Sequence, residues 1–376
     1  MKKICIVTTS HSAQETRVFH KEAKTLAGFG YEISLIAPGE GEVVTGRNIK
    51  NIYLPQAKKR ISRFLVLPQI AYRLALKEKA SIYHFHDPEL IPWMIMIKLF
   101  ARTKVIYDVH EDFPADLLQK KWLPRPLKKL FSICFDFFEK KAAAYFDYIV
   151  VVNDSLKEKF VKKGICKVEI VSNYPVLHEE STNISRIPSK RGKLPRIVYV
   201  GSISEEYGIR EIILAHEMIS DKIVFELIGS FDDQNLEKEI NRRKTPNLDF
   251  IGRIPHQEVY EYLMAADIAI ICFGRLPNYL NTGVGSNKLF EYMAAGLPII
   301  ATDFPNLKKI VEGNQCGICV DSSKPQEITR VIQYLIDNPV AAKEMGKNGK
   351  QAAQKKYNWG IEADKLLKIY KILCAE

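Results

Sequence analysis

The chain has 376 residues, of which 47% are apolar and 26% are charged, and no low-complexity tract interrupts it. This composition excludes a fibrous or disordered protein, and the length allows two domains with separate cores. No apolar run approaches the roughly 20 residues that a transmembrane helix needs. The first residues, 1–7, run directly into an expected strand, so we expect no signal peptide. Seven cysteines, an odd and scattered set, favour a reducing compartment such as the cytoplasm.

The net charge of +11 is concentrated in the first half of the chain. Residues 1–175 hold 29 Lys and Arg against 18 Asp and Glu, whereas residues 176–376 hold 26 of each kind. Such asymmetry predicts an anionic partner for the first half: a membrane, a nucleic acid or a phosphorylated substrate. A basic surface that is merely solvated is the alternative interpretation.

Short runs rich in Ile and Val alternate with helical patterns along the whole chain. Most of these runs are apolar without alternation, as in parallel strands that helices cover on both faces. Both halves are therefore expected to be doubly wound α/β domains. In the first half the expected strands are 3–9, 31–37, 49–55, 81–86, 104–110, 148–153 and 168–173. In the second half they are 196–201, 222–229, 248–252, 268–273, 298–303 and 318–321.

The polar residues between the two halves, 178–195, lack periodicity and indicate a linker. We expect one Rossmann-like domain over residues 1–178 and a second over residues 196–360. A last helical segment, 361–376, can cross back to the first domain. Because open α/β sheets bind ligands at the carboxyl ends of their strands, functional residues should lie in the loops after the strands.

The loop after the first strand offers hydroxyl groups, His11 and Arg17. It lacks the G-x-G-x-x-G fingerprint, which argues against a nicotinamide-dependent dehydrogenase. Arg17 is expected in the first turn of a helix, where a cation opposes the favoured sign of the helix dipole. We therefore expect Arg17 either to face an anionic ligand or to be an ordinary surface arginine.

Histidines and carboxylates gather at the tips of the fourth and fifth strands, in Tyr83-His-Phe-His-Asp-Pro-Glu-Leu90 and Tyr107-Asp-Val-His-Glu-Asp-Phe-Pro114. We expect these groups to hydrogen-bond a sugar and its acceptor, with His110 the best placed. A metal site is the less favoured alternative, because neighbouring strand residues point to opposite faces. Rigid turns at the two prolines are a third interpretation. The residues assigned to the acceptor side are His11, Arg17, His86, Asp87 and Glu111.

Two basic stretches of the first half, 58–77 and 120–131, interleave cations with Phe, Trp and Leu. Surfaces of this kind bind anionic lipid membranes, and each cation contributes about 1 kcal/mol to the binding free energy. We therefore predict peripheral attachment to the inner face of the cytoplasmic membrane. Nucleic acid would use the same charges, but neither half carries a recognition motif for it. An ordinary solvated helix face is the remaining alternative.

The most informative segment of the chain is 283–303. A glycine-bearing loop, Gly283-Val-Gly-Ser286, leads into a short helix that carries Glu291, and Gly296 ends that helix. Backbone N–H groups at a helix N-terminus bind anionic phosphates. A carboxylate one turn further on can accept hydrogen bonds from both ribose hydroxyls. The segment therefore predicts a site for a nucleoside diphosphate.

With these residues in view, the chain resembles glycosyltransferase family 4, whose members are retaining GT-B enzymes. In particular, it resembles bacterial members that build surface polysaccharides. It implies two Rossmann-like doubly wound domains that face a central cleft. It also implies transfer of a sugar from a nucleoside diphosphate sugar to a glycan or lipid-linked acceptor, without a metal. The segments that carry the resemblance are Glu15-Thr-Arg-Val-Phe-His-Lys-Glu-Ala23, His86-Asp-Pro-Glu-Leu90, Asp108-Val-His-Glu-Asp112 and Asn287-Lys-Leu-Phe-Glu-Tyr-Met-Ala-Ala-Gly296.

The resemblance also implies roles for single residues. Glu291 would bind the ribose, and His110 would contact the sugar near the reacting carbon. The backbone from Gly283 to Lys288 would hold the phosphates and the donor sugar. The remaining residues assigned to donor binding are Gly285, Ser286, Asn287, Gly201, Ser202 and Arg210.

The chain departs from the family at two places. The family usually has two glutamates in this loop, but Gly283 stands where the first is expected. After the first strand of the second domain, Ser202 and Tyr207 replace the usual Arg and Lys that bind the diphosphate. Lys288 and Arg210 are the nearest substitute cations.

For the reaction we expect retention at the anomeric carbon. A preorganised positive potential, from the helix N-terminus, Lys288 and Arg210, would stabilise the charge that grows on the departing diphosphate. No pair of carboxylates clearly supports a covalent double displacement, so the leaving phosphate is expected to take the acceptor's proton on the same face. A non-catalytic sugar- or lipid-binding pseudoenzyme is the alternative, because one carboxylate and two cations are missing.

Overall fold

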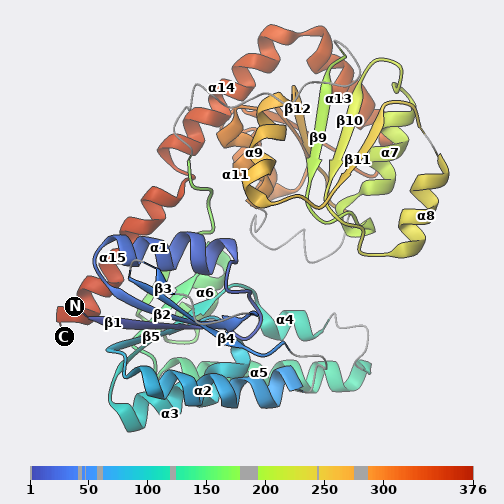
Figure 1. The fold of residues 1–376 in the computed structure, drawn as a ribbon. Coiled ribbons are helices and arrows are strands. Elements are labelled where there is room, and N and C mark those ends of the chain that lie inside the picture. Colours follow the sequence, from blue (N-terminus) through green and yellow to red (C-terminus); the bar gives the residue numbers. More distant parts are fainter. Residues whose placement is uncertain are drawn as a thin grey trace. The chain divides into compact units, whose positions relative to one another are not determined.

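The computed structural model describes residues 2–40, 45–46, 48–56, 62–118, 124–177, 194–243, 245–274 and 287–375. Its contacts divide the chain into two compact units, drawn in Figure 1. Unit 1 contains Met1–Asn173 and Trp359–Glu376, and unit 2 contains Tyr174–Asn358. The C-terminal segment therefore packs with the N-terminal half of the chain.

Unit 1 is built on an eight-stranded sheet with the order β3-β4-β2-β1-β5-β6-β7-β8. All neighbouring strands are parallel except the short antiparallel pair β3–β4. The seven parallel strands each lie within or overlap one of the seven ranges that the sequence predicted. The strands are β1 (Lys3–Val7), β2 (Glu32–Pro38), β3 (Thr45–Gly46), β4 (Ile49–Leu54), β5 (Ile82–Phe85), β6 (Lys104–Val109), β7 (Tyr148–Val151) and β8 (Val168–Ile170).

Helices cover both faces of this sheet, because successive strand residues point to opposite sides. Cys5 and Val7 belong to the core under α2, α3 and α5, whereas Ile4 and Ile6 belong to the core under α1 and α15. Figure 1 shows α15 on the same face as α1. The helical segments are η1 (Thr16–Ala23, a π-helix), α1 (Lys24–Gly28), η2 (Ser62–Val66, a π-helix), α2 (Leu67–Glu78), η3 (Pro88–Leu90, a 3-10 helix), α3 (Ile91–Ala101), α4 (Phe113–Leu117), α5 (Arg125–Ala143), α6 (Asp154–Lys162) and α15 (Trp359–Ala375).

Unit 2 contains a six-stranded parallel sheet with the order β11-β10-β9-β12-β13-β14. Its strands overlap the six ranges predicted for the second half. They are β9 (Arg196–Val200), β10 (Val224–Ile228), β11 (Leu248–Gly252), β12 (Ile268–Ile271), β13 (Ile299–Thr302) and β14 (Gly317–Val320). The helical segments are η4 (Glu205–Tyr207, a 3-10 helix), α7 (Ile209–Glu217), α8 (Gln234–Arg243), α9 (His256–Ala265), α11 (Asn287–Ala295), α12 (Pro305–Val311), α13 (Pro325–Asp337) and α14 (Pro339–Lys355).

The strand orders confirm the predicted pair of Rossmann-like domains and show where each sheet should bind a ligand. In unit 1 the order reverses between β1 and β5, and in unit 2 it reverses between β9 and β12. Ligands of open α/β sheets bind beyond the carboxyl ends of the strands at such reversals. The loops that follow these four strands therefore frame the candidate sites.

None of the helices in the described ranges combines the length and the apolar character that crossing a membrane would require.

Candidate functional site

In unit 2, Glu291 lies on helix α11, which packs against the sheet through its buried side chains. Leu289 and Tyr292, on the same helix, are buried in the core, and Tyr292 Oη accepts a hydrogen bond from the backbone N–H of Val200 (2.9 Å). The Glu291 carboxylate keeps 17% exposure, and its Oε1 lies 2.9 Å from Nε2 of His256. A carboxylate that is half enclosed and fixed on a packed helix is suited to accept hydrogen bonds from a diol.

His256 is a residue that the sequence reasoning missed. It is the first residue of α9 and follows Pro255 in the loop after β11. The expectation that function lies after the strands would have included it, but no motif singled it out. Its contact with Glu291 makes it part of the candidate site.

Lys288 lies in a cage of aromatic rings beside the end of β9. Its Nζ donates a hydrogen bond to Tyr199 Oη (2.9 Å) and lies 3.9 Å from the ring centre of Tyr207. Contacts of this kind hold an ammonium group by cation–π attraction. Burial lowers the pKa of Lys288 to about 7, and the neighbouring carboxylates of Glu291 and Asp232 oppose this shift only in part. The buried cation is thus poised to bind an anion.

Glycines let the loops after β9 and β10 come close to this cation. At Gly201, whose φ is +131°, an added Cβ would lie 2.6 Å from Nζ of Lys288. At Gly229, an added Cβ would overlap the carbonyl oxygen of Gly201. Ser202 Oγ donates to Asp232 Oδ1 (2.5 Å), which fixes the next residue of the first loop. The structure therefore brings Gly201 to Lys288, and Ser202 is the next residue of the same loop.

Arg210 has a different environment from the one expected of a diphosphate ligand. Its Nη2 lies 2.6 Å from Glu205 Oε1, and its Nη1 contacts the carboxylate of Glu239. These two hydrogen bonds, the one to Glu205 above all, raise the pKa of Arg210. Two carboxylates already neutralise this guanidinium, so the structure favours Lys288 over Arg210 as the substitute cation.

Four residues assigned to donor binding lie in or next to the glycine-bearing loop. Gly283, Gly285 and Ser286 lie outside the described residues. Asn287 begins α11 and is partly buried.

In unit 1, Asp87 joins the loops after β1 and β5. Its carboxylate accepts hydrogen bonds from Thr8 Oγ1 (2.7 Å) and from the backbone N–H of Thr9 (2.6 Å), and it also contacts the Ser10 hydroxyl. Burial alone would raise the pKa of Asp87, but the nearby His11 and these hydrogen bonds hold it below its usual value. Asp87 was expected to meet the acceptor. It is 3% exposed, and its oxygens accept hydrogen bonds from the protein's own groups, so in this structure it fixes the two loops. Its contact with the acceptor stays a prediction.

Arg17 also differs from the expectation, which was that it faces a ligand or lies on the surface. It does lie in the first turn of η1, but it is only 1% exposed. Its Nη2 lies 2.8 Å from Asp108 Oδ2, and its Nε lies 2.9 Å from Glu22 Oε1. The anions that it faces are therefore the protein's own. Asp108 is distant in the sequence, so no local spacing could have paired it with Arg17.

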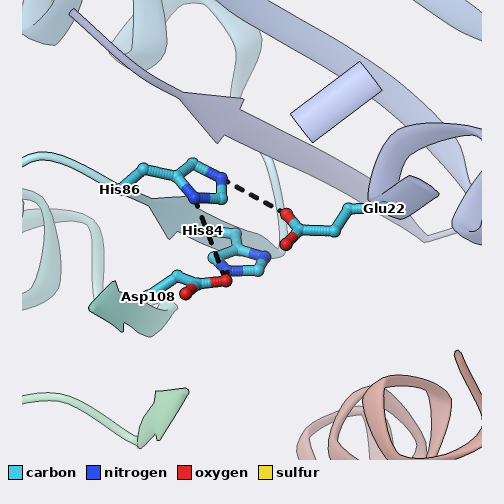
Figure 2. A group of neighbouring side chains, drawn as sticks. All are labelled: Glu22, His84, His86 and Asp108. Atoms are coloured by element: carbon cyan, nitrogen blue, oxygen red, sulfur yellow. Dashed lines mark ion pairs between the residues drawn. The ribbon is translucent and has the colours of Figure 1, made fainter. Parts of the chain in front are cut away.

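Two buried histidines complete this cluster, which Figure 2 shows. His86 Nε2 lies 3.4 Å from Glu22 Oε2, and His84 Nε2 lies 3.4 Å from Asp108 Oδ2. These four side chains, Glu22, His84, His86 and Asp108, are all buried, and we call them with Arg17 the buried cluster.

The buried cluster bears on the metal alternative. His84 lies on β5, and His86 comes two residues later, just after the strand ends. Their rings are stacked, so strand alternation does not separate them as the sequence argument assumed. One ligand atom from each of the four residues lies within 4.8 Å of the others. However, the Arg17 guanidinium already contacts both carboxylates. A metal ion beside a buried guanidinium would be repelled, so we interpret the cluster as an internal ion-pair network.

His110 connects this network to the protein surface. It follows β6, its side chain is 20% exposed, and its Nε2 lies 3.0 Å from Nδ1 of His86. The ring of His11 lies 5.0 Å from the ring of His110. Glu111, the next residue, is exposed. Thus His110, His11 and Glu111 lie at the carboxyl ends of the strands, where the sequence placed them, whereas His86 is buried beneath them.

Two Rossmann-like domains with strand-end sites of this kind define the GT-B class of fold. Residues 16–174 match the family described as Glycosyltransferase Family 4, and residues 180–352 match the one described as Glycosyl transferases group 1. The chain belongs to these glycosyltransferases. The resemblance noted in the sequence is thereby confirmed.

Relatives of known sequence are distant. An uncharacterized glycosyltransferase of Methanocaldococcus jannaschii is 24% identical over 60% of this chain and 59% of its own length. An N,N'-diacetylbacillosaminyl-diphospho-undecaprenol alpha-1,3-N-acetylgalactosaminyltransferase of Campylobacter jejuni is 20% identical over 86% of this chain and 96% of its own. The match spans about three fifths of the first relative's length. Among solved structures, a sucrose-phosphate synthase from Thermosynechococcus elongatus has a TM-score of 0.77 at 18% identity, and each chain is covered completely.

Proposed function

We propose that this protein is a retaining glycosyltransferase that moves a sugar from a nucleoside diphosphate sugar to a glycan or lipid-linked acceptor in bacterial surface polysaccharide synthesis. The observation that carries the proposal is the site in unit 2, where a buried cation and a fixed carboxylate stand on one helix. Lys288 supplies positive charge beside the loops after β9 and β10, whose glycines allow a close approach. Glu291 supplies acceptors for hydroxyl groups. Family membership supports the same reading.

In the proposed donor complex, the diphosphate lies beside Lys288 and the backbone N–H groups at the start of α11. The ribose hydroxyls donate to Glu291. Charge that develops on the departing diphosphate is then stabilised by groups already in place, which lowers the barrier without reorganisation. No metal or other cofactor is needed for this step.

In unit 1, His110 is the proposed contact to the transferred sugar, with His11 and Glu111 on the acceptor side. The leaving phosphate takes the proton from the acceptor hydroxyl, which gives retention without a covalent intermediate. The name of the Campylobacter jejuni relative specifies an acceptor joined to diphospho-undecaprenol. That name supports, for this chain, an acceptor carried on an anionic lipid.

A surface of unit 1 supports attachment to a membrane that holds such an acceptor. Apolar side chains of α5 recur at helical spacing and are 38–61% exposed, and Lys129, Lys140 and Lys141 on the same helix are exposed. We call this the α5 surface; its apolar residues are Leu127, Leu130, Phe131, Ile133, Phe137 and Phe138.

The α5 surface includes an apolar hollow of about 380 Å³, lined by Leu117, Phe131, Cys134, Phe135 and Phe138. Exposed apolar side chains that gather on one surface can mark an interaction site. With cations on the same helix, the chemistry that it fits is an anionic lipid surface. We therefore propose that the protein acts at the inner face of the cytoplasmic membrane. Residues 57–61 and 119–123, which belong to the two basic stretches predicted from the sequence, lie outside the described residues.

The proposal is tested by incubating the full chain with a panel of nucleoside diphosphate sugars and lipid-diphosphate-linked sugars, and by analysing products by mass spectrometry and NMR. Transfer with the donor's anomeric configuration kept in the product is the expected result. Transfer with inversion would contradict the mechanism. Binding of donors without transfer or hydrolysis would favour the non-catalytic alternative, and stabilisation by NAD(H) would favour a dehydrogenase.

A further inference from the structure

In unit 2, His256 and Glu291 extend from two helices that pack against each other. His256 is the first residue of α9, and Glu291 lies on α11. Val259 and Leu263 of α9 are buried in the same core as Leu289 of α11. This packing fixes the two backbones, so the side chains of His256 and Glu291 meet from defined positions.

The two side chains are joined by one hydrogen bond whose direction is defined. His256 Nε2 lies 2.9 Å from Glu291 Oε1. A carboxylate accepts hydrogen bonds and a ring N–H donates them, so the imidazole is the donor. The His256 side chain is 58% exposed, and that of Glu291 is 17% exposed. An imidazole in contact with solvent therefore holds a carboxylate that is itself largely enclosed.

This hydrogen bond leaves the carboxylate able to bind a diol. In the part of the chain that the structure describes, Glu291 Oε2 receives no hydrogen bond. Each carboxylate oxygen has two lone-pair directions, so Oε1 can accept a second hydrogen bond beside the one from His256. The two hydroxyls of a ribose stand on adjacent ring carbons, and both can reach one carboxylate when its plane is turned toward them. His256 fixes this plane before a ligand arrives.

The orientation of the Glu291 carboxylate depends on His256, since no other residue of the described ranges donates a hydrogen bond to it. A glutamate side chain has several rotatable bonds and loses much conformational entropy when it is ordered. When a ligand must order such a side chain on binding, its affinity is reduced. A side chain that is already held does not reduce the affinity in this way. Removal of His256 should therefore weaken a ligand that binds through Glu291.

We propose that His256 is a positioning residue that preorganises Glu291 for the two hydroxyls of a ribose. The inference rests on the proposed function for the identity of that ligand, a nucleoside diphosphate whose ribose binds Glu291. It adds that His256 acts through Glu291 and not on the base or the phosphates. Because the ribose takes no part in the transfer itself, loss of His256 should raise the KM for the donor and leave kcat nearly unchanged.

A double-mutant cycle of His256 and Glu291 tests this coupling. Uridine, adenosine and guanosine diphosphates are titrated by calorimetry into the full chain, and the tightest binder is carried through the variants. His256→Ala should weaken its binding by about threefold to about tenfold, the size expected when a ligand must order one long side chain. In a chain that already carries Glu291→Ala, the same change should have no effect, because the carboxylate that His256 orients is gone.

Two further variants and one further ligand separate positioning from a merely structural role. In His256→Gln the amide Nε2 can donate to the same oxygen, so the affinity should stay within about twofold of the wild type. Glu261→Ala, at an exposed position further along α9, is the matched control and should bind as the wild type does. The 2′,3′-dideoxy form of the same nucleotide lacks both hydroxyls, so His256→Ala and the wild type should bind it equally.

The inference alone is overturned if His256→Ala leaves the affinity unchanged or raises it, or if it weakens binding equally with and without Glu291. An equal loss for the dideoxy nucleotide, or a loss in His256→Gln as large as in His256→Ala, would also overturn it. A wild type that binds no nucleotide, or a Glu291→Ala variant that binds as tightly as the wild type, would instead overturn the proposed function and this inference with it.

Discussion

Glu291 is the carboxylate on which donor binding depends in this account. In Glu291→Ala, hydrogen bonds from the ribose to a charged acceptor are lost, and such bonds contribute about 1.5–3 kcal/mol. We expect the affinity for a nucleotide sugar, measured by calorimetry, to fall by about tenfold to about a hundredfold. Glu344→Ala, at an exposed site on α14, is the control. Equal affinities in the two variants would contradict the assignment of Glu291.

Lys288 predicts a pH dependence of donor binding. Its pKa is held at about 7 by burial in the free protein. Below this pH the ammonium is already charged, whereas above it an anionic ligand must bring a proton into the site. Affinity for a nucleotide sugar, whose diphosphate diester does not titrate here, should therefore fall by about tenfold per pH unit above neutrality.

Calorimetry between about pH 6 and about pH 9 checks this, together with proton uptake measured in buffers of different ionisation enthalpy. Lys288→Met should bind weakly at every pH and lose the slope. A wild-type affinity that does not change with pH would show that Lys288 is not the diphosphate cation.

Single residues were the part of the site that sequence predicted least well. The spacing within 283–303 located Lys288 and Glu291, because a loop, a helix start and a carboxylate one turn on form a local pattern. The contact of His256 with Glu291 and that of Asp108 with Arg17 each join distant parts of the chain. Their meeting depends on strand order and on the cost of burying a charge, neither of which a local pattern specifies.

Among the elements, α5 makes the clearest prediction. Each large apolar side chain transferred from water contributes about 1.5–3 kcal/mol. The double variant Leu130→Ser/Phe137→Ser should therefore reduce binding to anionic vesicles by at least about tenfold. Flotation of the full chain with vesicles measures the bound fraction.

The matched control is Val340→Ser, which removes an 83% exposed apolar residue of unit 2. Added salt should weaken binding of the wild type, since exposed lysines contribute through screened charge. If the wild-type protein stays unbound, or if the double variant floats as well as the wild type, the α5 surface is not a membrane-binding surface.

The strands were predicted more fully than the helices. Continuous apolar runs such as 196–201 and 268–273 specify strands that are buried on both faces, and all thirteen expected ranges contain or overlap a parallel strand. The short β3 and the two π-helical segments were not anticipated. Their backbone geometry depends on contacts with neighbouring elements, and apolar periodicity in the sequence does not reveal such contacts.

For the chain as a whole, α15 ties the last residues to the first. Leu366 and Tyr370 are completely buried in the core that β1 shares with α1. A large-to-small change in a packed core costs about 2–5 kcal/mol. Leu366→Ala should therefore destabilise unit 1, so that it lowers the same unfolding transition as Ile6→Ala and not the one lowered by Ile300→Ala in unit 2.

Pulse proteolysis with identification of fragments separates the two transitions, and Lys368→Ala, at an exposed position of α15, is the control. A loss of stability confined to residues 174–358 would contradict the division of the chain into these units. The sequence could suggest that the last helix crosses back to the first domain, because a helical pattern follows the second domain. Which face of the first sheet α15 covers is known only from the packed core.

The central claim, that unit 2 holds a nucleoside diphosphate at one end of its sheet, is tested most directly by a crystal structure of the full chain with a nucleoside diphosphate bound. The account predicts the diphosphate beside Lys288 Nζ and the ribose hydroxyls within hydrogen-bond distance of Glu291. A nucleotide bound away from α11, with both side chains left as they are in the free protein, would contradict it.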